Sequence, residues 1–575
     1  MVDKTCHLNP FVYLSETDIR FYLIVLISIA VPALWALILG LVLAAVEAQL
    51  EMSVIVRLLI CVPLVLFIPL VIYWQYRRHP ENIIKKAGLK VLSREKFPDH
   101  TACIDRLRTS HAISLNPTLM YEPLNSSVSA HAFGTRDHIY ASLDGGLISV
   151  FRTDPGRFKS IVLHEFGHMI NMDVGKAYLA DAAWRTMRII VSVLTGVLVL
   201  MLLFTLPGAT QVDVVKDFLL TFGIIVFLLI FLGIVYVLRN QIIRLRELYA
   251  DAKVREWGSS AALLSALGSS KEGEHSPLEF LARFHPGIRE RIAVLKNNLP
   301  LFRRDLWVAF SIGFSYGVIV ISIPQVWQLL FTLTSAQWDM MKVAEISVTP
   351  ETGTALLAVV SLFIFTFLML AISSTFHRSV LKDFFVHHSP LFSPETLRDS
   401  VEFSLVFSLG FFVYYLIFTP TAIAVYDAGT IVSDLATSIS EFLVLAAYFF
   451  VSLLFVLLFA SMLIRQSFSA KAATKNFFML SMLASLLFVV NEFYAVQTVH
   501  NRYLIIVFFL VFSGALYLFI RIGNRTLHCP YCSTKLPAQD EIGARCHHCD
   551  KALFSWAVSP DMPEGEKEEK TEGIS

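Results

Sequence analysis

Charged side chains are scarce in this sequence. Of its 575 residues, 16% are Asp, Glu, Lys or Arg and 55% are hydrophobic, with a mean hydropathy of +0.63. A soluble domain carries roughly a quarter charged residues, so this composition excludes a chain that is only a soluble domain. The net charge of +1 supplies no excess of positive charge, and we expect no nucleic-acid partner.

Cysteine is also scarce. Of 7 cysteines, Cys6, Cys61 and Cys103 are scattered, and the other four form two close pairs near the C-terminus. Close CxxC pairs are typical of metal ligands, which argues against a secreted disulfide framework. A cleavable signal is not evident, because the first apolar run is too long for a signal core and a second run soon follows. We read the first run as a retained membrane helix.

Long apolar runs account for the hydrophobic excess. A membrane helix needs about 20 apolar residues, and each run approaches or exceeds this length. We therefore predict a mainly α, polytopic membrane protein in a lipid bilayer. Its ten predicted transmembrane helices lie at about 21–46, 56–75, 188–208, 217–238, 306–333, 354–376, 402–425, 440–464, 477–497 and 503–520.

Lys and Arg gather in alternate connections between these helices. A dense basic series from Arg77 to Lys96 follows the second helix, whereas Glu47 and Glu51 occupy the first connection. Positive charge marks the cytoplasmic side, so both termini are expected in the cytosol, most simply of a bacterial cytoplasmic membrane.

Two polar stretches on that side are large enough to fold. They span 76–187 and 239–305, and only the membrane hairpin at 188–238 separates them. The first contains strand-like alternation at 128–131 and 139–143. We expect the two stretches to form one α+β domain on the cytosolic face.

The sequence IVLHEFGHMIN places His164 and His168 four residues apart. On a helix this spacing puts both imidazoles on one face, where they can bind one Zn²⁺. Glu165 lies beside them and can take a proton from a zinc-bound water. A chance match is the alternative, and it is expected in only about a few per cent of such chains.

A catalytic zinc takes three protein ligands and leaves a fourth position for water. The segment RLRELYAD offers Glu247 as the third ligand and Asp251, on the same helical face, as an acceptor for an imidazole N–H. An ordinary charged helix face would show the same spacing. The predicted hairpin favours Glu247 as a ligand, because it returns the chain to the membrane face that holds HEFGH.

These motifs together carry a family resemblance. HEFGHMINMDV, a two-helix hairpin, ELYAD and HPGIRERIAVL resemble the membrane-bound gluzincins of the HtpX-like heat-shock protease and CAAX prenyl protease family, over about residues 20–297. That family carries HExxH followed by ExxxD. The matching positions here are His164, Glu165, His168, Glu247 and Asp251.

The resemblance also implies residues that touch substrate. The family's HPxxxxR motif is matched at His285 and Arg291, which would hold the substrate or the developing oxyanion, although a solvated helix face also explains Arg291. SAHAFGTRDHIYASLDGGL is similar to the family's edge strand. His131 stands where the family has asparagine, and Ala132 and Phe133 keep the pattern. An extended peptide would pair with this edge.

The C-terminal cysteines predict a second metal site. Cys529, Cys532, Cys546 and Cys549 form two CxxC pairs with the spacing of a structural Cys₄ zinc ribbon. The predicted cofactors are therefore one catalytic and one structural Zn²⁺. The ribbon would dock a protein partner or substrate, and the polar tail after Pro560 is expected to be disordered.

The predicted domains follow from these assignments. They are a membrane hairpin at 1–75, a metallopeptidase domain at 76–305 interrupted by the hairpin at 188–238, a six-helix membrane domain at 306–522, a zinc ribbon at 526–556 and a tail at 560–575. The predicted function is a zinc endopeptidase that acts on membrane-associated peptides or proteins, in quality control or processing.

Two other functions are alternatives to this prediction. A site-two-type intramembrane protease takes an aspartate from an LDG-like turn downstream of HExxH, but Leu143-Asp144-Gly145 lies upstream, and TDPGRFKS is too polar for a bilayer. A receptor or scaffold would use the zinc for signalling and would account for the later helices. Glu402, Glu441 and Glu492 near predicted helix ends are read as interfacial, not as an ion path.

Replacing the expected base separates the protease from the scaffold. In the Glu165→Gln protein, we expect peptide cleavage to fall by at least about 100-fold, because the water loses its proton acceptor, while zinc content is unchanged. Zinc analysis and a cleavage assay on the same preparation measure both. Cleavage at the wild-type rate would contradict the role of Glu165.

Overall fold

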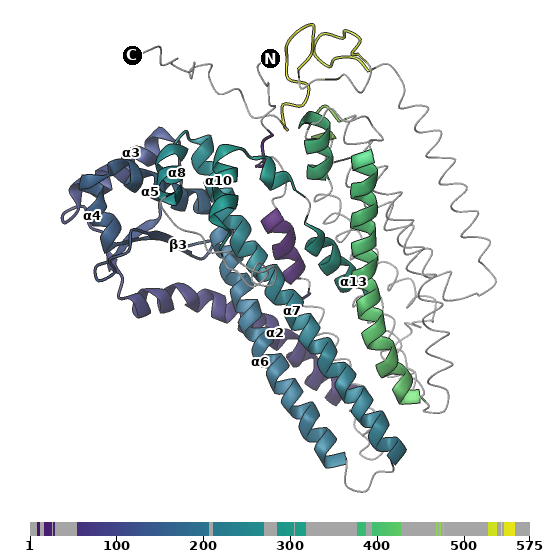
Figure 1. The fold of residues 1–575 in the computed structure, drawn as a ribbon. Helices are drawn as coiled ribbons and strands as arrows, with labels where there is room; N and C mark the ends of the chain where they lie inside the picture. Colours follow the sequence, from purple (N-terminus) through teal and green to yellow (C-terminus); the bar gives the residue numbers. More distant parts are fainter. Residues whose placement is uncertain are drawn as a thin grey trace, which may run out of the picture.

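The computed structural model describes residues 8–11, 16–25, 27–28, 54–205, 211–268, 285–303, 305–317, 377–386, 394–426, 467–469, 471–472, 475, 527–537, 542 and 545–557. These described residues are mostly helical and contain one small sheet (Figure 1).

The named elements follow the chain in a simple order. The helices are α2 (Val54–Ala87), α3 (Pro98–Ser110), α4 (Gly145–Thr153), α5 (Pro155–Ile170), α6 (Asp173–Thr205), α7 (Gln211–Glu256), α8 (Ser260–Gly268), α10 (Ile288–Lys296) and α13 (Pro394–Tyr426), with a 3-10 turn η1 (Leu299–Phe302). The strands are β1 (Lys90–Val91), β2 (Thr118–Glu122), β3 (Ala130–Gly134) and β4 (Ile139–Asp144). Residues 16–25, 306–317 and 377–386 are also helical.

The sheet has the strand order β1-β2-β4-β3, so β3 lies at an edge. β2 and β4 are parallel, whereas β3 and β4 form an antiparallel hairpin in which Ala132 is opposite Ala141. The hairpin turns at Gly134, which has a φ of +133°, and a Cβ there would lie 2.2 Å from the carbonyl oxygen of His138. Only glycine fits this turn.

Each face of the sheet is covered by a helix (Figure 1). On one face, Ala132 and Leu143 pack in a cluster with Phe158 and Phe166 of α5. On the other face, Phe133 packs with residues at the end of α2. The sheet is thus fixed beside the helix that carries the HEFGH segment.

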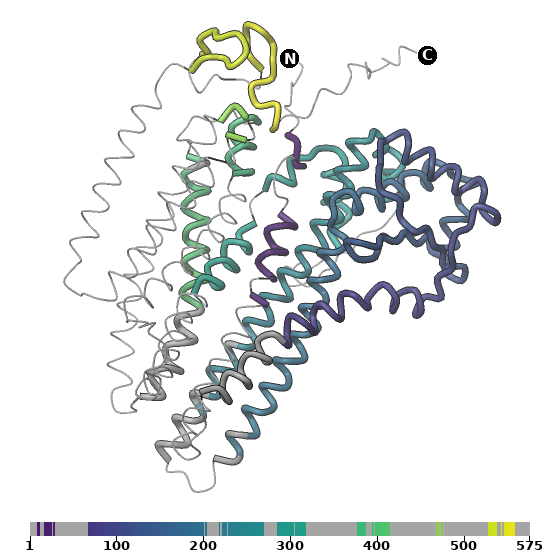
Figure 2. The backbone as a smooth tube through the Cα atoms, turned by 180° about the vertical axis from the view of Figure 1, so that it is seen from behind, coloured from purple at the N-terminus to yellow at the C-terminus, as the bar shows by residue number. Residues whose placement is uncertain are grey.

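α6 and α7 form a long hairpin that extends away from the sheet (Figures 1 and 2). Among the described residues, two helices are long and apolar enough to cross a membrane, Asp173–Leu200 and Thr221–Glu256. Large apolar side chains are exposed along the same helices and along α2. Those exposed side chains include Phe67, Leu70, Trp74, Ile189, Val193, Leu200, Leu203, Phe218, Phe222 and Leu229.

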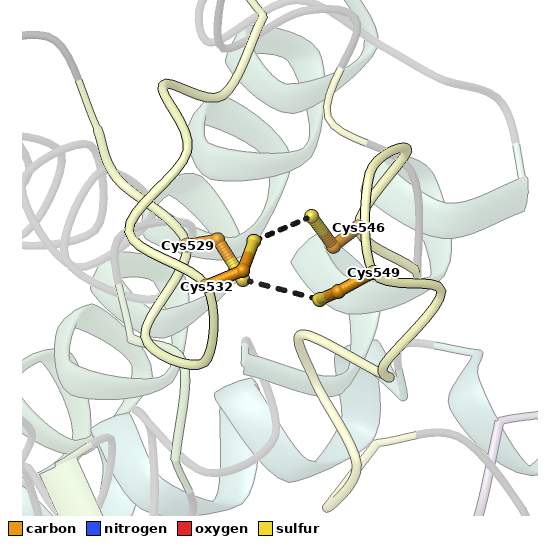
Figure 3. Close-up of side chains that lie close together, drawn as sticks. All are labelled: Cys529, Cys532, Cys546 and Cys549. Carbon is orange, nitrogen blue, oxygen red and sulfur yellow. Dashed lines mark hydrogen bonds between the residues drawn. The ribbon is translucent and has the colours of Figure 1, made fainter.

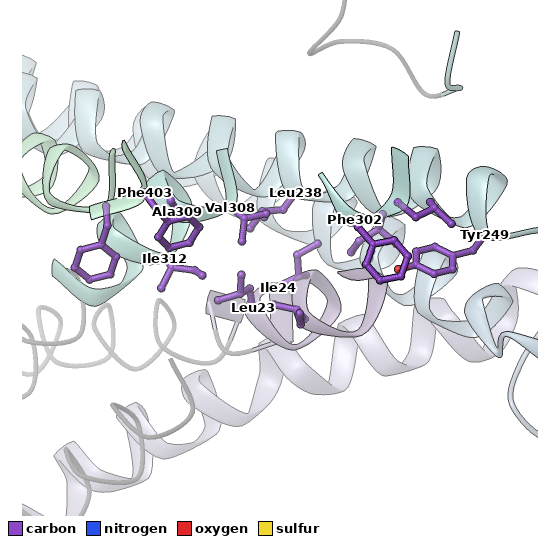
Figure 4. Close-up of a cluster of buried hydrophobic side chains, with 14 of the residues drawn as sticks. Leu23, Ile24, Leu238, Tyr249, Phe302, Val308, Ala309, Ile312 and Phe403 are labelled. Carbon is purple, nitrogen blue, oxygen red and sulfur yellow. The ribbon is translucent and has the colours of Figure 1, made fainter. Parts of the chain in front are cut away.

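A buried apolar cluster joins this hairpin to the rest of the helices (Figure 4). Leu238 and Tyr249 of α7 belong to it, as do Leu23, Phe302 and Phe403, which come from three distant parts of the sequence. α13 packs along α7. The metal-ligand helix predicted from the sequence is therefore also a central packing element.

The described helices include several of the predicted membrane runs. α2, α6, α7 and α13 contain most of the runs at 56–75, 188–208, 217–238 and 402–425, and residues 306–317 begin another. The runs at 354–376, 440–464, 477–497 and 503–520, most of 21–46 and the tail at 560–575 lie outside the described residues.

The helices continue past the ends of these runs. α2 continues to Ala87 and α7 to Glu256, so the predicted domain boundaries at 75 and 238 fall inside helices. A helix needs no break where it leaves an apolar layer, because its backbone hydrogen bonds are internal. The strand expected at 128–131 begins at Ala130 instead, because a turn at Asn125 precedes it, in which the Ser127 N–H donates to Asn125 Oδ1.

α5 and α7 approach each other closely at Gly167. A Cβ on Gly167 would lie 3.1 Å from Ala250 Cα and 3.2 Å from its carbonyl oxygen. The contacting atoms are mainly backbone and cannot move aside as a side-chain end could. This glycine, which costs roughly 1 kcal/mol of helix propensity, permits the two helices to meet.

We therefore expect Gly167→Val to lower the free energy of unfolding by about 1–3 kcal/mol, because the added methyl groups force α5 from α7. Gly233→Val in α7 is the matched control, because a Cβ on Gly233 meets nothing within 4 Å. Thermal unfolding of both variants in one detergent measures the difference. Equal midpoints would contradict the close approach.

Candidate metal centre

The two histidines of HEFGH lie on one face of α5. The helix starts at Pro155, and the Asp154 side chain accepts the Arg157 N–H at 2.9 Å, which caps the first turn. One turn apart, the rings of His164 and His168 have centroids 4.8 Å apart. Both side chains are buried.

Glu247 reaches the same two imidazoles from α7. Its Oε2 lies 3.3 Å from His164 Nε2, and its Oε1 lies 3.4 Å from His168 Nε2. Ligands bonded to zinc at about 2.0–2.2 Å in tetrahedral geometry stand roughly 3.3 Å from one another. The three side chains therefore fit the spacing of a three-ligand zinc site.

Each imidazole directs its second nitrogen at a carboxylate. His164 Nδ1 lies 3.0 Å from Asp251 Oδ1, and His168 Nδ1 lies 3.2 Å from Asp173 Oδ1. Both carboxylates are almost fully buried, at 0% and 1% exposure. Such acceptors select the tautomer with a proton on Nδ1, which leaves Nε2 free to bind a metal.

Arg291 supports one of these carboxylates. Its Nε and Nη2 donate to the two oxygens of Asp251 at 2.7 and 2.8 Å. This two-bond pairing fixes the carboxylate as well as balancing its charge. The family resemblance implied that Arg291 holds substrate or oxyanion, but the contacts place it behind the His164–Asp251 pair.

The carboxylates make the site attractive to a cation. Burial alone would lower the pKa of both imidazoles. The hydrogen bond and charge of Asp251 nevertheless raise the pKa of His164, and the charges of Asp173 and Glu247 raise the pKa of His168 to about 10. The negative charges that favour a proton on these imidazoles would also favour a divalent metal ion, which would displace that proton.

Glu165 lies between the metal position and the sheet. His164, Glu165 and His168 each offer a ligand atom within 4.8 Å of the others. Glu165 Oε2 also accepts the backbone N–H of Ala132 at 2.5 Å. The structure thus holds the expected base by the edge strand, one residue away from a metal ligand.

The outer edge of β3 faces this carboxylate. The Ala132 N–H meets Glu165, and its carbonyl oxygen lies 3.5 Å from the hydroxyl of Tyr178. Phe133 is buried and its ring stacks on Tyr140. His131 is exposed and its Nε2 lies 3.9 Å from Asp144 Oδ2. His285, also exposed, stands at the start of the segment that leads into α10.

Sequence reasoning missed Asp173 and Tyr178. Asp173 follows His168 by five residues, a spacing that does not share a helical face. The chain leaves α5 at Asn171 and turns through Met172, whose φ is +50°, before α6 begins at Asp173. This turn brings the carboxylate back to His168. The only signal in the sequence for Asp173 was that a polar residue stands at the first turn of a helix.

The four C-terminal cysteines converge on a second centre (Figure 3). The sulfurs of Cys529 and Cys549 are 3.7 Å apart, and those of Cys532 and Cys546 are 3.8 Å apart. Tetrahedral Zn–S bonds of about 2.3 Å require sulfurs roughly 3.8 Å apart.

Both CxxC pairs have the same backbone turn. The N–H of Ser533 donates to the Cys529 carbonyl, and the N–H of Asp550 donates to the Cys546 carbonyl. Ser533 and Asp550 each have a positive φ. Two matched turns that aim four sulfurs inward fit a metal-binding ribbon, and we call residues 527–557 the Cys₄ module.

Comparison with known proteins places the first centre in a class. The model of peptidase family M48 matches residues 94–299, which include the HEFGH and ELYAD segments. No curated protein and no solved structure matches the chain. The match supports an M48 family metallopeptidase, a class of zinc-dependent hydrolases, and the predicted metallopeptidase class is thereby confirmed.

Removing the second carboxylate tests the geometry. We expect Asp173→Asn to lower zinc affinity by about 10- to 100-fold, because His168 loses the acceptor that fixes its tautomer. Competition with a chromogenic chelator measures the affinity. Asp137→Asn is the control, because Asp137 is exposed and pairs with Arg77 on the surface. Equal affinities in both variants would contradict the assignment.

Proposed function

We propose that this protein is a zinc metalloendopeptidase held in a membrane, with His164, His168 and Glu247 as ligands of the catalytic ion. One observation carries the proposal. Glu247, on the second helix of the long α6–α7 hairpin, lies 3.3 Å from His164 Nε2 and 3.4 Å from His168 Nε2. Asp251 and Asp173 orient the imidazoles, and Arg291 acts through Asp251.

A bound zinc ion supplies Lewis acidity, which activates water and polarises the scissile carbonyl. The chain's own residues then move the proton. Glu165 takes it from the attacking water and delivers it to the leaving amine. The Ala132 N–H, which donates to Glu165, keeps the carboxylate aimed along the strand edge. His285 is proposed to contact the substrate near the oxyanion.

The substrate is proposed to bind as an extended peptide along β3. The outer side of this edge strand carries the Ala132 N–H and carbonyl oxygen, which contact Glu165 and Tyr178, and a peptide that pairs along it would align the scissile bond beside Glu165. His131, Ala132 and Phe133 would form this contact. Peptide backbone is common to all substrates, so this mode suits a peptidase of broad specificity.

The position of the site favours membrane-associated substrates. α7 runs without a break from its apolar part to Glu247, and from Leu238 to Glu247 the helix rises only roughly 14 Å. The ion would therefore sit close to the bilayer surface. We propose a cytosolic active site in an HtpX-like or CAAX-type peptidase that cuts membrane proteins in quality control or processing.

The Cys₄ module is proposed to hold a structural zinc ion. All four sulfurs point at one centre, which leaves no open position for a substrate or water. The reduced thiols of a cytosolic module would suit zinc better than disulfides.

The proposal is tested by incubating the purified protein in lipid nanodiscs with membrane and soluble protein substrates. Mass spectrometry should find new peptide ends at internal sites, a chelator should abolish them, and added Zn²⁺ should restore them. The Glu165→Gln protein is the matched control and should yield none. Cuts that survive the chelator, or that appear with Glu165→Gln, would overturn the proposal.

A further inference from the structure

The metal-ligand turn of α7 is held from both sides. Glu247 and Asp251 are four residues apart and share the face that meets α5. Tyr249 lies between them, about 200° around the helix from Glu247, and so points away from the metal centre. Its side chain is 2% exposed, and it packs in the buried cluster with Phe302 (Figure 4).

Arg378 contacts the back of this turn. It comes from the helix at 377–386, far from the peptidase segment in sequence, and is 1% exposed. Its Nη1 donates to the Tyr249 hydroxyl, and its Nη2 donates to the carbonyl oxygen of Pro10 at 3.3 Å. One guanidinium thus joins the N-terminal segment, helix 377–386 and α7.

The N-terminal segment at residues 8–11 also touches α7 directly. The ring of Phe11 lies edge-on to Tyr249 with centroids 6.1 Å apart, and Lys253 Nζ lies 4.3 Å from the centre of the Phe11 ring. Lys253 is one turn beyond Tyr249 on the same helix. The segment therefore rests against the two turns that carry and follow the metal ligand.

The Cys₄ module contacts both the N-terminal segment and the helix at 377–386 (Figure 2). The Asn9 N–H donates to the carbonyl oxygen of Ala557 at 2.7 Å. The rings of Phe554 and Trp556 pack against Phe384 and His377, both on the helix that carries Arg378. Phe384, Phe554 and Trp556 belong to one buried apolar cluster, and His377 beside them is 4% exposed.

We propose that Tyr249 and Arg378 are positioning residues through which the Cys₄ module holds the Glu247 turn of α7 in its metal-binding position. This rests on the proposed function of the site. It gives the module an internal partner, the back of the peptidase, where the sequence suggested an external one.

A metal site tolerates only small changes in the distances between its ligands. α5 holds two ligands and α7 holds the third, so a shift of α7 changes the distances from Glu247 to both histidines. A misplacement of about 1 Å can cost 100-fold in rate. Filling the Cys₄ site orders the module, because small metal-bound modules fold with their ion. An ordered module fixes helix 377–386 and residues 8–11, and through them Tyr249.

The experiment uses the full-length protein loaded with Co²⁺, whose thiolate and imidazole sites absorb differently and can be titrated separately. Tyr249→Phe removes only the hydroxyl that meets Arg378. Cys532→Ser with Cys546→Ser removes the second metal. We expect each change to weaken Co²⁺ binding at the His164–His168–Glu247 site by about tenfold. Combined, they should weaken it no more than the larger single effect, because both break one chain of contacts.

Tyr236→Phe is the matched control, since it makes the same change in α7 where the ring packs on Trp184. It should bind Co²⁺ as the wild type does. Affinity within twofold of wild type for Tyr249→Phe, or losses that add in the combined variant, would overturn the proposal. A wild-type protein that binds no Co²⁺ at the imidazole site would instead refute the proposed function itself.

Discussion

The burial of three carboxylates beside two imidazoles is the constraint on which the rest of the structure depends. Glu247, Asp251 and Asp173 are each less than 9% exposed. Burying a carboxylate is costly unless an opposite charge and hydrogen bonds accompany it. Arg291 balances Asp251, and Arg246 Nε lies 3.5 Å from Glu247 Oε1. A cation between the two Nε2 atoms and Glu247 would add to this balance.

That constraint explains the course of the chain. Two ligands lie on α5 and the third lies on α7, the second helix of the α6–α7 hairpin, and both helices of this hairpin are apolar enough to cross a membrane. A long, continuous α7 brings Glu247 to α5 with the stiffness of a helix, and Gly167 lets the backbones approach. A pair of helices that is apolar enough to cross a membrane thus also carries a metal ligand to the site.

Local spacing explains what could be predicted from the sequence. His164 and His168 share a face because an α-helix repeats every 3.6 residues, and the CxxC pairs converge because their turn is local. Glu247 needed the argument from membrane topology. The position of Asp173 beside His168 was not predicted, because it depends on the positive φ of Met172, which no periodic pattern in the sequence reveals. The pairing of Arg291 with Asp251 could not be predicted either, because the two residues lie 40 residues apart.

Contacts between distant segments could not be predicted either, because they do not follow from local spacing. Nothing in the sequence pairs Asn9 with Ala557 or Arg378 with Tyr249, since neither pair follows a helical or strand period. These contacts link the C-terminal half of the chain to the peptidase. They place helix 377–386 and the Cys₄ module behind the metal-ligand helix.

The central claim is that one ion binds His164, His168 and Glu247 together. Zinc K-edge X-ray absorption of the Cys532→Ser, Cys546→Ser protein loaded with one zinc ion tests it most directly. The account predicts scattering from two imidazoles and only nitrogen or oxygen neighbours at about 2.0–2.2 Å. A spectrum without imidazole scattering, or one that stays the same when Glu247 is replaced by alanine, would contradict it.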